Sequence, residues 1–194
     1  MRALGVLAVV AMTAAACGSS VPPTLPGPPS RYLIGLDQLT SPDFIVYAPL
    51  ESVGAGWLDA ASSTAVRRDG LVRAAQVEYY RDVAFSTSNG PITLTAAVAA
   101  FTSAPGAAAA VIRLVTALDA RAHAVPVSTG PLGDGGHAVT VQGSVQGVAA
   151  LQVIVVWRVD NLVNSLVAEG RLGGLQLDQL VPLAATQTAN ERAG

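Results

Sequence analysis

The chain has no lysine, one cysteine and few aromatic residues, and only 12% of its 194 residues are charged. Nucleic-acid-binding proteins carry a basic surface, and a formal net charge of −2 does not fit that class. Because Cys17 is alone, the chain forms no internal disulfide. Stability must therefore come from an ordinary hydrophobic core, for which 51% apolar residues provide the material.

The amino-terminal residues have the layout of a bacterial export signal. Arg2 supplies positive charge, an apolar run extends from Ala3 to Met12, and three alanines lead directly to Cys17. A membrane-spanning helix needs about 20 apolar residues, so this run is too short to be one. The segment therefore indicates export rather than a transmembrane span.

The stretch from Ala15 to Gly18 resembles the lipobox of bacterial lipoproteins, although Ala14 stands where leucine is commonest. In that family the cysteine receives a diacylglyceryl group and the signal is cut just before it. The resemblance implies a signal peptide over residues 1–16, lipidation of Cys17, and membrane contact through its acyl chains. Two or more chains hold durably, because each buried CH₂ contributes about 0.8 kcal/mol. Ordinary secretion and an uncleaved signal anchor are the alternatives.

A proline-rich stretch follows the cysteine and completes the segment of residues 17–30. Proline favours the extended polyproline II conformation, which rises about 3.1 Å per residue. We interpret this segment as a tether that holds the domain away from the membrane. The remaining residues, 31–194, are long enough for a single domain with its own core.

Short β-branched or alternating runs predict a series of strands. These runs are Asp43–Ala48, Leu71–Arg81, Ile92–Ala100, Ala124–Val127, Ala138–Gln142, Ala150–Arg158 and Leu162–Glu169. The run from Leu151 to Trp157 is almost continuously apolar, which is typical of a strand covered on both faces. Asp160 and Asn161 tolerate the positive φ of a tight turn and predict a hairpin there.

Two main helices are predicted beside these strands. The first begins after Ser103, a suitable N-cap, and ends near Arg121. Its apolar stripe is Val111, Leu114, Val115 and Leu118. The second lies between Leu175 and Arg192, where Pro182 marks either a first turn or a kink. With a shorter helix over 58–67, the order predicts an α+β domain whose helices pack on a mostly antiparallel sheet.

Three segments are similar to poorly characterised exported lipoproteins of actinobacteria and their neighbours. They are FTSAPGAAAAVIRL, GPLGDGGHAVTV and VVWRVDNLVNSLVAEG. Mycobacterial relatives of this broad architecture resemble the Mog1/PsbP fold, a curved antiparallel sheet flanked by helices. The resemblance implies a fold and carries no activity.

Catalytic and metal-binding side chains are sparse. His123 and His137 are not in a metal-ligand spacing, and we expect neither to be a ligand or a general base. Asp134 lies in the glycine-rich loop Ser128–Gly136, where a turn residue is a better interpretation than a calcium ligand, because calcium takes six to eight oxygens. We therefore expect no catalytic site, no metal and no cofactor.

Several other residues stand out without forming a recognisable site. Trp57 lies in a glycine-flanked loop, where it plugs the core or lines a pocket, and Trp157 ends the apolar strand. Arg158 and Glu169 lie near the two ends of the last hairpin. The acids are interpreted as scattered and solvent-facing: Glu51, Asp59, Asp69, Glu78 and Asp82.

These observations predict a lipid-anchored, non-catalytic binding or accessory module on the extracytoplasmic face of the membrane. A more specific hypothesis is that the module carries a lipid or another hydrophobic ligand, because low charge and many small residues allow an apolar cavity between sheet and helix. An envelope hydrolase and a structural partner of another envelope protein are the alternatives.

Overall fold

The structure is a computed structural model that describes residues 24–25, 27–53 and 60–193, with the side chains of 49–53 and 60–63 left out. Cys17, the signal segment and Trp57 lie outside the described residues, so their predicted roles stay predictions. None of the helices in the described ranges has the length and apolar character needed to cross a bilayer.

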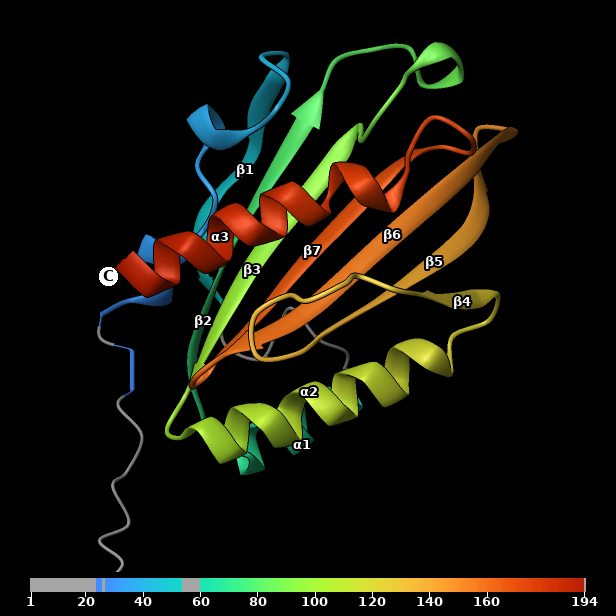
Figure 1. Cartoon of the computed structure of the whole chain (residues 1–194). Coiled ribbons are helices and arrows are strands. Elements are labelled where there is room, and N and C mark those ends of the chain that lie inside the picture. Colours follow the sequence, from blue (N-terminus) through green and yellow to red (C-terminus); the bar gives the residue numbers. More distant parts are fainter. Residues whose placement is uncertain (1–23, 26, 54–59, 194) are drawn as a thin grey trace, which may run out of the picture.

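One twisted sheet of seven strands forms the centre of the domain (Figure 1). Its strands are β1 (Phe44–Val53), β2 (Leu71–Arg81), β3 (Thr93–Phe101), β4 (Ala124–Val127), β5 (Gly136–Val145), β6 (Val148–Val159) and β7 (Leu162–Arg171). They lie in the order β1-β2-β3-β7-β6-β5-β4, and every neighbouring pair is antiparallel. The predicted α+β class is confirmed.

The alternating pattern in β2 correctly predicted which of its faces is buried. Ala75, Val77 and Tyr79 are buried on one face, whereas Gln76 and Glu78 are half-buried on the other. The hairpin of β5 and β6 is longer than the apolar residues alone predicted. Pairing continues from Ala138–Gln142 out to Val145 and Val148, around the turn at Gln146 and Gly147, both with positive φ.

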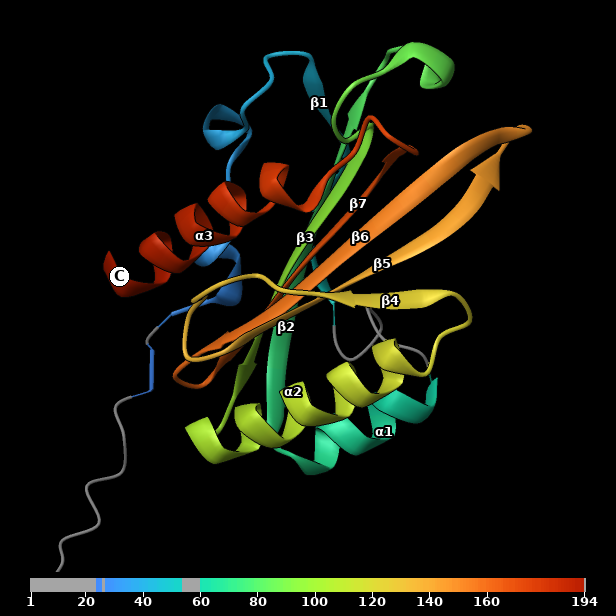
Figure 2. The ribbon, with the colours of Figure 1, turned by 45° about the vertical axis from the view of Figure 1, so that its right-hand side comes forward.

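Helices cover both faces of the sheet (Figure 2). One face carries α1 (Ala60–Arg68) and α2 (Ala104–Asp119), and the other carries α3 (Val181–Ala193). Ser103 caps α2 by accepting a hydrogen bond from the Gly106 amide at 3.2 Å. Pro182 lies in the first turn of α3, so the helix starts there instead of kinking.

Within the described residues, four short 3₁₀ helices that the sequence did not predict join these elements. They are η1 (Pro29–Tyr32), η2 (Leu36–Gln38), η4 (Phe85–Thr87) and η5 (Leu177–Gln179). Pro29 is buried, and the Leu25 amide donates a hydrogen bond to Asn161 Oδ1 at 2.8 Å. The last residues of the expected tether therefore contact the domain.

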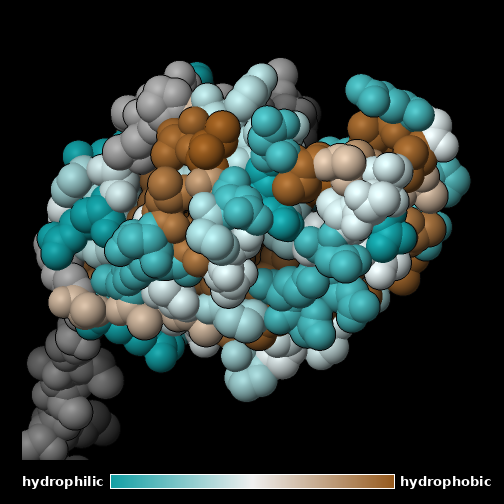
Figure 3. Space-filling model, turned by 90° about the horizontal axis from the view of Figure 1, so that it is seen from above, coloured by the Kyte–Doolittle hydropathy of each residue, from teal (hydrophilic) through white to brown (hydrophobic). Residues whose placement is uncertain are grey.

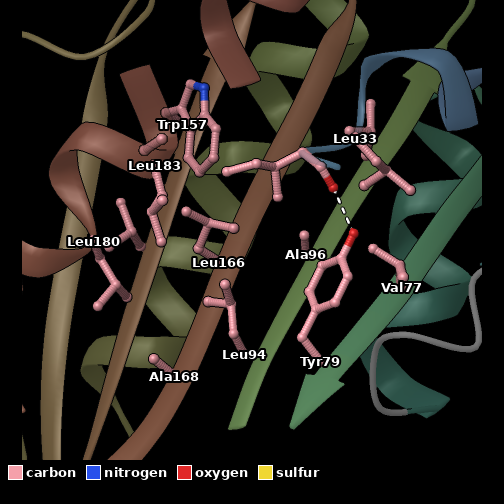
Figure 4. Close-up of a cluster of buried hydrophobic side chains, with 14 of the residues drawn as sticks. Leu33, Val77, Tyr79, Leu94, Ala96, Trp157, Leu166, Ala168, Leu180 and Leu183 are labelled. Carbon is pink, nitrogen blue, oxygen red and sulfur yellow. Dashed lines mark hydrogen bonds between the residues drawn. The ribbon is translucent and has the colours of Figure 1, made fainter. Parts of the chain in front are cut away.

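Two hydrophobic layers, one on each face of the sheet, form the core. Figure 4 shows the layer under α3, where Trp157 and Leu166 from the sheet meet Leu183 from the helix. The hydroxyl of Tyr79 donates a hydrogen bond of 2.6 Å to the Ile34 carbonyl, which fastens the segment after η1 to the sheet. Residues 153–157 of β6 are buried, as the continuous apolar run predicted.

Candidate functional site

Helices α1 and α2 leave one end of their face of the sheet uncovered. The hydrophobic layer under α2 includes Ala99 and Phe101, from the last residues of β3. Thr93, the first residue of β3, lies on the same face because side chains alternate along a strand. It lies at the opposite end of the strand, away from α2.

A row of polar side chains crosses this uncovered end. Tyr80 on β2 pairs with Thr93, which pairs with Glu169 on β7, and Glu169 pairs in turn with Gln152 on β6. Directly opposed residues on neighbouring strands have side chains about 5 Å apart and share a face. All four are half-buried. Glu78 lies one pair further along β2 on the same face.

Two hollows meet at Glu169 and form what we call the sheet groove. The larger, of about 330 Å³, is bounded by Tyr80 and Phe85 on one side and by Gln146 on the other. The smaller, of about 170 Å³, extends toward Gln152. Figure 3 views the molecule from above and shows a notch between the main body and a lobe, on the side where the β5–β6 hairpin projects in Figure 1.

Arginines hold one wall of the groove, the loop that joins β2 to β3 and carries Phe85. Arg81 Nη1 donates hydrogen bonds to the carbonyl oxygens of Asn89 at 2.9 Å and Pro91 at 3.2 Å. Arg171 donates to the Ser88 carbonyl at 3.2 Å and to Asn89 Oδ1 at 3.3 Å. The aromatic wall is therefore fastened to the strands from both ends.

The polar side chains of the groove are unpartnered within the described part of the chain. No hydrogen bond or ion pair engages the side chains of Thr93, Gln152 or Glu169 there. Buried or half-buried polar groups normally find a partner in the protein, in water or in a ligand. The groove is thus a place where solvent or a ligand supplies the partners.

A second set of polar side chains lies buried on the opposite face, and we call it the α3 cluster. Its four members are all 0% exposed: Trp157, Asn164, Gln187 and Glu191. Gln187 Nε2 donates a 2.9 Å hydrogen bond to Asn164 Oδ1. The unpartnered atoms are Trp157 Nε1, Asn164 Nδ2, Gln187 Oε1 and both Glu191 carboxyl oxygens.

Burial controls the protonation of Glu191. Desolvation is the main cause that raises the pKa of Glu191 from 4.5 to about 8. The Asn164 side chain, which lies nearby without a well-formed hydrogen bond to the carboxyl group, and the positive charge of Arg192 each lower the pKa in part. Asp134 and Asp160 raise the pKa a little further through repulsion. The carboxyl group is therefore mostly neutral near pH 7. Sequence reasoning missed this group, although Glu191 falls four residues after Gln187, on the helix face that Leu180 and Ala184 bury.

The residues singled out in the sequence are dispersed over the domain. His137 Nε2 lies 2.8 Å from Asp119 Oδ1, whereas His123 is exposed, with φ of +63°. Neither histidine is hydrogen-bonded to a serine within the described residues. Trp157 is buried in the core as part of the α3 cluster.

Asp134 stabilises the turn between β6 and β7. Its Oδ2 accepts a hydrogen bond from the Asp160 amide at 2.8 Å and lies 3.3 Å from Arg158 Nη1. In the described ranges, no group of three or more His, Cys, Asp or Glu side chains is placed to hold a metal ion. Of the acids predicted to face solvent, Asp69 is instead mostly buried and pairs with Arg113 at 2.8 Å, while Glu78 is half-buried on the same sheet face as the groove.

Comparison with known proteins gives a fold and no family. No protein-family model matches the sequence, and no curated protein matches it. A solved structure that resembles the domain is the extracellular domain of PknH from Mycobacterium tuberculosis, with a TM-score of 0.54 and 12% sequence identity. The match covers 85% of this chain and 95% of that one. The fold of this chain is therefore similar to that of a mycobacterial extracellular domain.

Proposed function

We propose that the protein is a lipoprotein anchored by acyl chains on Cys17, whose domain binds a polar ligand at the outer face of the cytoplasmic membrane. Two independent features support the location. The stretch from Ala15 to Gly18 resembles a lipobox, and the fold is similar to that of an extracellular domain. The domain begins close behind the anchor, so it stays near the membrane surface.

The observation that carries the binding function is the sheet groove. Tyr80, Thr93, Glu169 and Gln152 present a phenol, a hydroxyl, a carboxylate and an amide on one exposed end of a sheet. Ligand sites combine a concave surface with a few convergent polar groups, and the groove has both. A rigid sheet holds the four groups in fixed register, which favours selective binding over loose adsorption.

A polar ligand fits this geometry better than the lipid that the composition suggested. The space between the sheet and α3 is filled by core side chains such as Leu94, Leu166 and Leu180, each 0% exposed. The hollows at the sheet groove are open, and in the larger one Glu169 and Thr93 lie beside apolar residues such as Val83, Ile92 and Val145. A fatty chain lying there would bury the Glu169 carboxylate without a partner, which is unfavourable.

A second candidate function is docking of another envelope protein on β1. This strand forms one edge of the sheet, and three consecutive apolar residues on it are exposed: Ile45 by 54%, Val46 by 46% and Tyr47 by 68%. Exposed apolar edge strands are sites where a second chain adds a strand. A photocrosslinker at position 47 should capture one discrete partner in cells, with position 142 as the control. If the same set of crosslinked proteins is recovered at both positions, this candidate is eliminated.

Nuclear magnetic resonance tests the binding function. The full chain carrying Cys17→Ala gives a protein without lipid, to which either maltotriose, a neutral sugar, or choline, a cation, is added. We expect at least one probe to shift the backbone amides of Phe85, Thr93 and Glu169, and Tyr80→Leu to remove the shift. If both probes leave these amides unchanged, the sheet groove is not a binding site.

A further inference from the structure

Resting on the proposed function, we infer that the sheet groove recognises a cationic amine, the ammonium group of a small ligand or of one end of a longer one. The juxtaposition that carries the inference is a carboxylate that forms no ion pair within the described chain, in an open hollow that Tyr80 and Phe85 also line.

The charged side chain that lines both hollows is a carboxylate, that of Glu169, while Arg81 and Arg171 hold the loop beside them. Glu169 lies where the two hollows meet, and Glu78 faces the same side of the sheet. Arg171 lies two residues beyond Glu169 on the same face, but its guanidinium donates to Ser88, Asn89 and Leu172 and forms no ion pair with Glu169. An anionic ligand would meet a carboxylate here, whereas a cation gains an attraction that the described chain leaves unused.

Aromatic side chains supply the second half of a cation site. Tyr80 and Phe85 line the same hollow as Glu169, and the Tyr47 ring lies 6.0 Å from the Tyr80 ring, centroid to centroid. The faces of aromatic rings attract ammonium groups, and quaternary ammonium ligands are commonly bound in this way. A neutral sugar would also stack on these rings but would leave the carboxylate charge uncompensated.

The polar neighbours and the size of the hollow limit the ligand further. Thr93 and Gln152 flank Glu169 in the cross-strand row and can accept hydrogen bonds from N–H groups. A volume of about 330 Å³ is at the small end of ligand pockets, which range from roughly 300 to 1,000 Å³. The hollow therefore takes one amine group rather than a large cofactor.

A matched pair of probes separates charge from shape. Choline is compared with its carbon analogue, in which a neutral tert-butyl group replaces the trimethylammonium group, in titrations of the full-length Cys17→Ala protein. We expect choline to bind about tenfold more tightly than the analogue, a difference worth about 1.4 kcal/mol, and to weaken as salt is raised. Equal affinities for the two probes would overturn the inference.

Variants test whether Glu169 is responsible. We expect Glu169→Gln to weaken choline binding about tenfold and to leave binding of the carbon analogue unchanged. Asp119→Asn removes the same charge from an exposed site on α2 and should leave both affinities unchanged. If Glu169→Gln binds choline as the parent does, the inference is wrong.

The outcome for the neutral sugar separates this inference from the proposed function. Binding of maltotriose at the groove amides without binding of choline would refute a cation site and leave the binding function standing. Absence of binding by both probes would refute both.

Discussion

The sheet groove and the α3 cluster both hold a glutamate without a partner, yet one glutamate is open to water and the other is sealed. Glu169 is half-buried at the uncovered end of the sheet, whereas Glu191 is 0% exposed beneath α3. Water can solvate Glu169, so its charge costs little and is available to a ligand. Burial instead raises the pKa of Glu191 to about 8. A glutamate side chain thus supports the proposed binding site on one face, and on the other face it makes stability depend on pH.

The largest expected effect is the loss of stability when Glu191 ionises. Its pKa is 4.5 in the unfolded chain and about 8 in the folded protein, so the folded state holds the proton more tightly. The contribution of Glu191 to stability should be greatest below about pH 4.5 and should be lost as the pH rises through 8, by roughly 3 to 5 kcal/mol in all. Urea unfolding between about pH 5 and pH 9 measures the change.

Glu191→Gln replaces the carboxyl group by an amide of similar shape that does not ionise. The unfolding free energy of this variant should therefore vary much less than that of the parent over the same pH range. Glu169→Gln is the matched change on the open face and should retain the dependence of the parent protein. A Glu191→Gln protein with the same pH slope as its parent would show that another group causes it.

The next largest effect concerns the glycine-rich loop that covers Trp157. Gly133 has φ of +55°, and a Cβ there would clash with the Arg158 carbonyl oxygen and lie 2.9 Å from Trp157 Cδ1. We expect Gly133→Ala to destabilise the protein by about 2 to 4 kcal/mol and to change the tryptophan fluorescence.

Gly130 is the control for that substitution. It also has a positive φ, +66°, but a Cβ there would have no neighbour within 4 Å. Gly130→Ala should therefore cost only about 1 kcal/mol, from backbone strain alone. Equal losses of unfolding free energy for the two variants would mean that Gly133 is not packed closely against Arg158 and Trp157.

Tyr79 and Tyr80 are consecutive in β2 and point to opposite faces of the sheet, so substitutions of these two residues compare the two faces. The buried Tyr79 hydroxyl donates to the Ile34 carbonyl, whereas the Tyr80 hydroxyl has no hydrogen-bond partner among the described residues. Tyr79→Phe leaves that carbonyl unpaired and should cost about 1 to 2 kcal/mol of unfolding free energy. Tyr80→Phe should cost almost nothing, and a larger loss for Tyr80→Phe would contradict the difference between the faces.

The smallest effect on stability is expected for Glu169→Gln. A half-exposed side chain without protein partners contributes within about 0.5 kcal/mol, so the unfolding free energy at pH 7 should match that of the parent. A loss above about 1 kcal/mol would mean that Glu169 supports the fold and is not reserved for a ligand.

The fold could be predicted from local patterns, but the groove and the cluster could not. The alternation in β2, the apolar run of β6 and the Ser103 cap each act within a few residues. The row from Tyr80 to Gln152 instead depends on the register of four strands from distant parts of the chain. Glu191 was missed for another reason: charged residues near a helix end are usually solvated, and only tertiary packing buries this one.

The proposed place of action depends on acyl chains at Cys17 that hold the domain outside the cytoplasmic membrane. Metabolic labelling with radioactive palmitate tests this anchor most directly. Label should enter the parent protein, and the Cys17→Ala variant should be unlabelled and released from the membrane fraction. Absence of label in the parent, or equal labelling of the variant, would contradict the anchor and with it the proposed place of action.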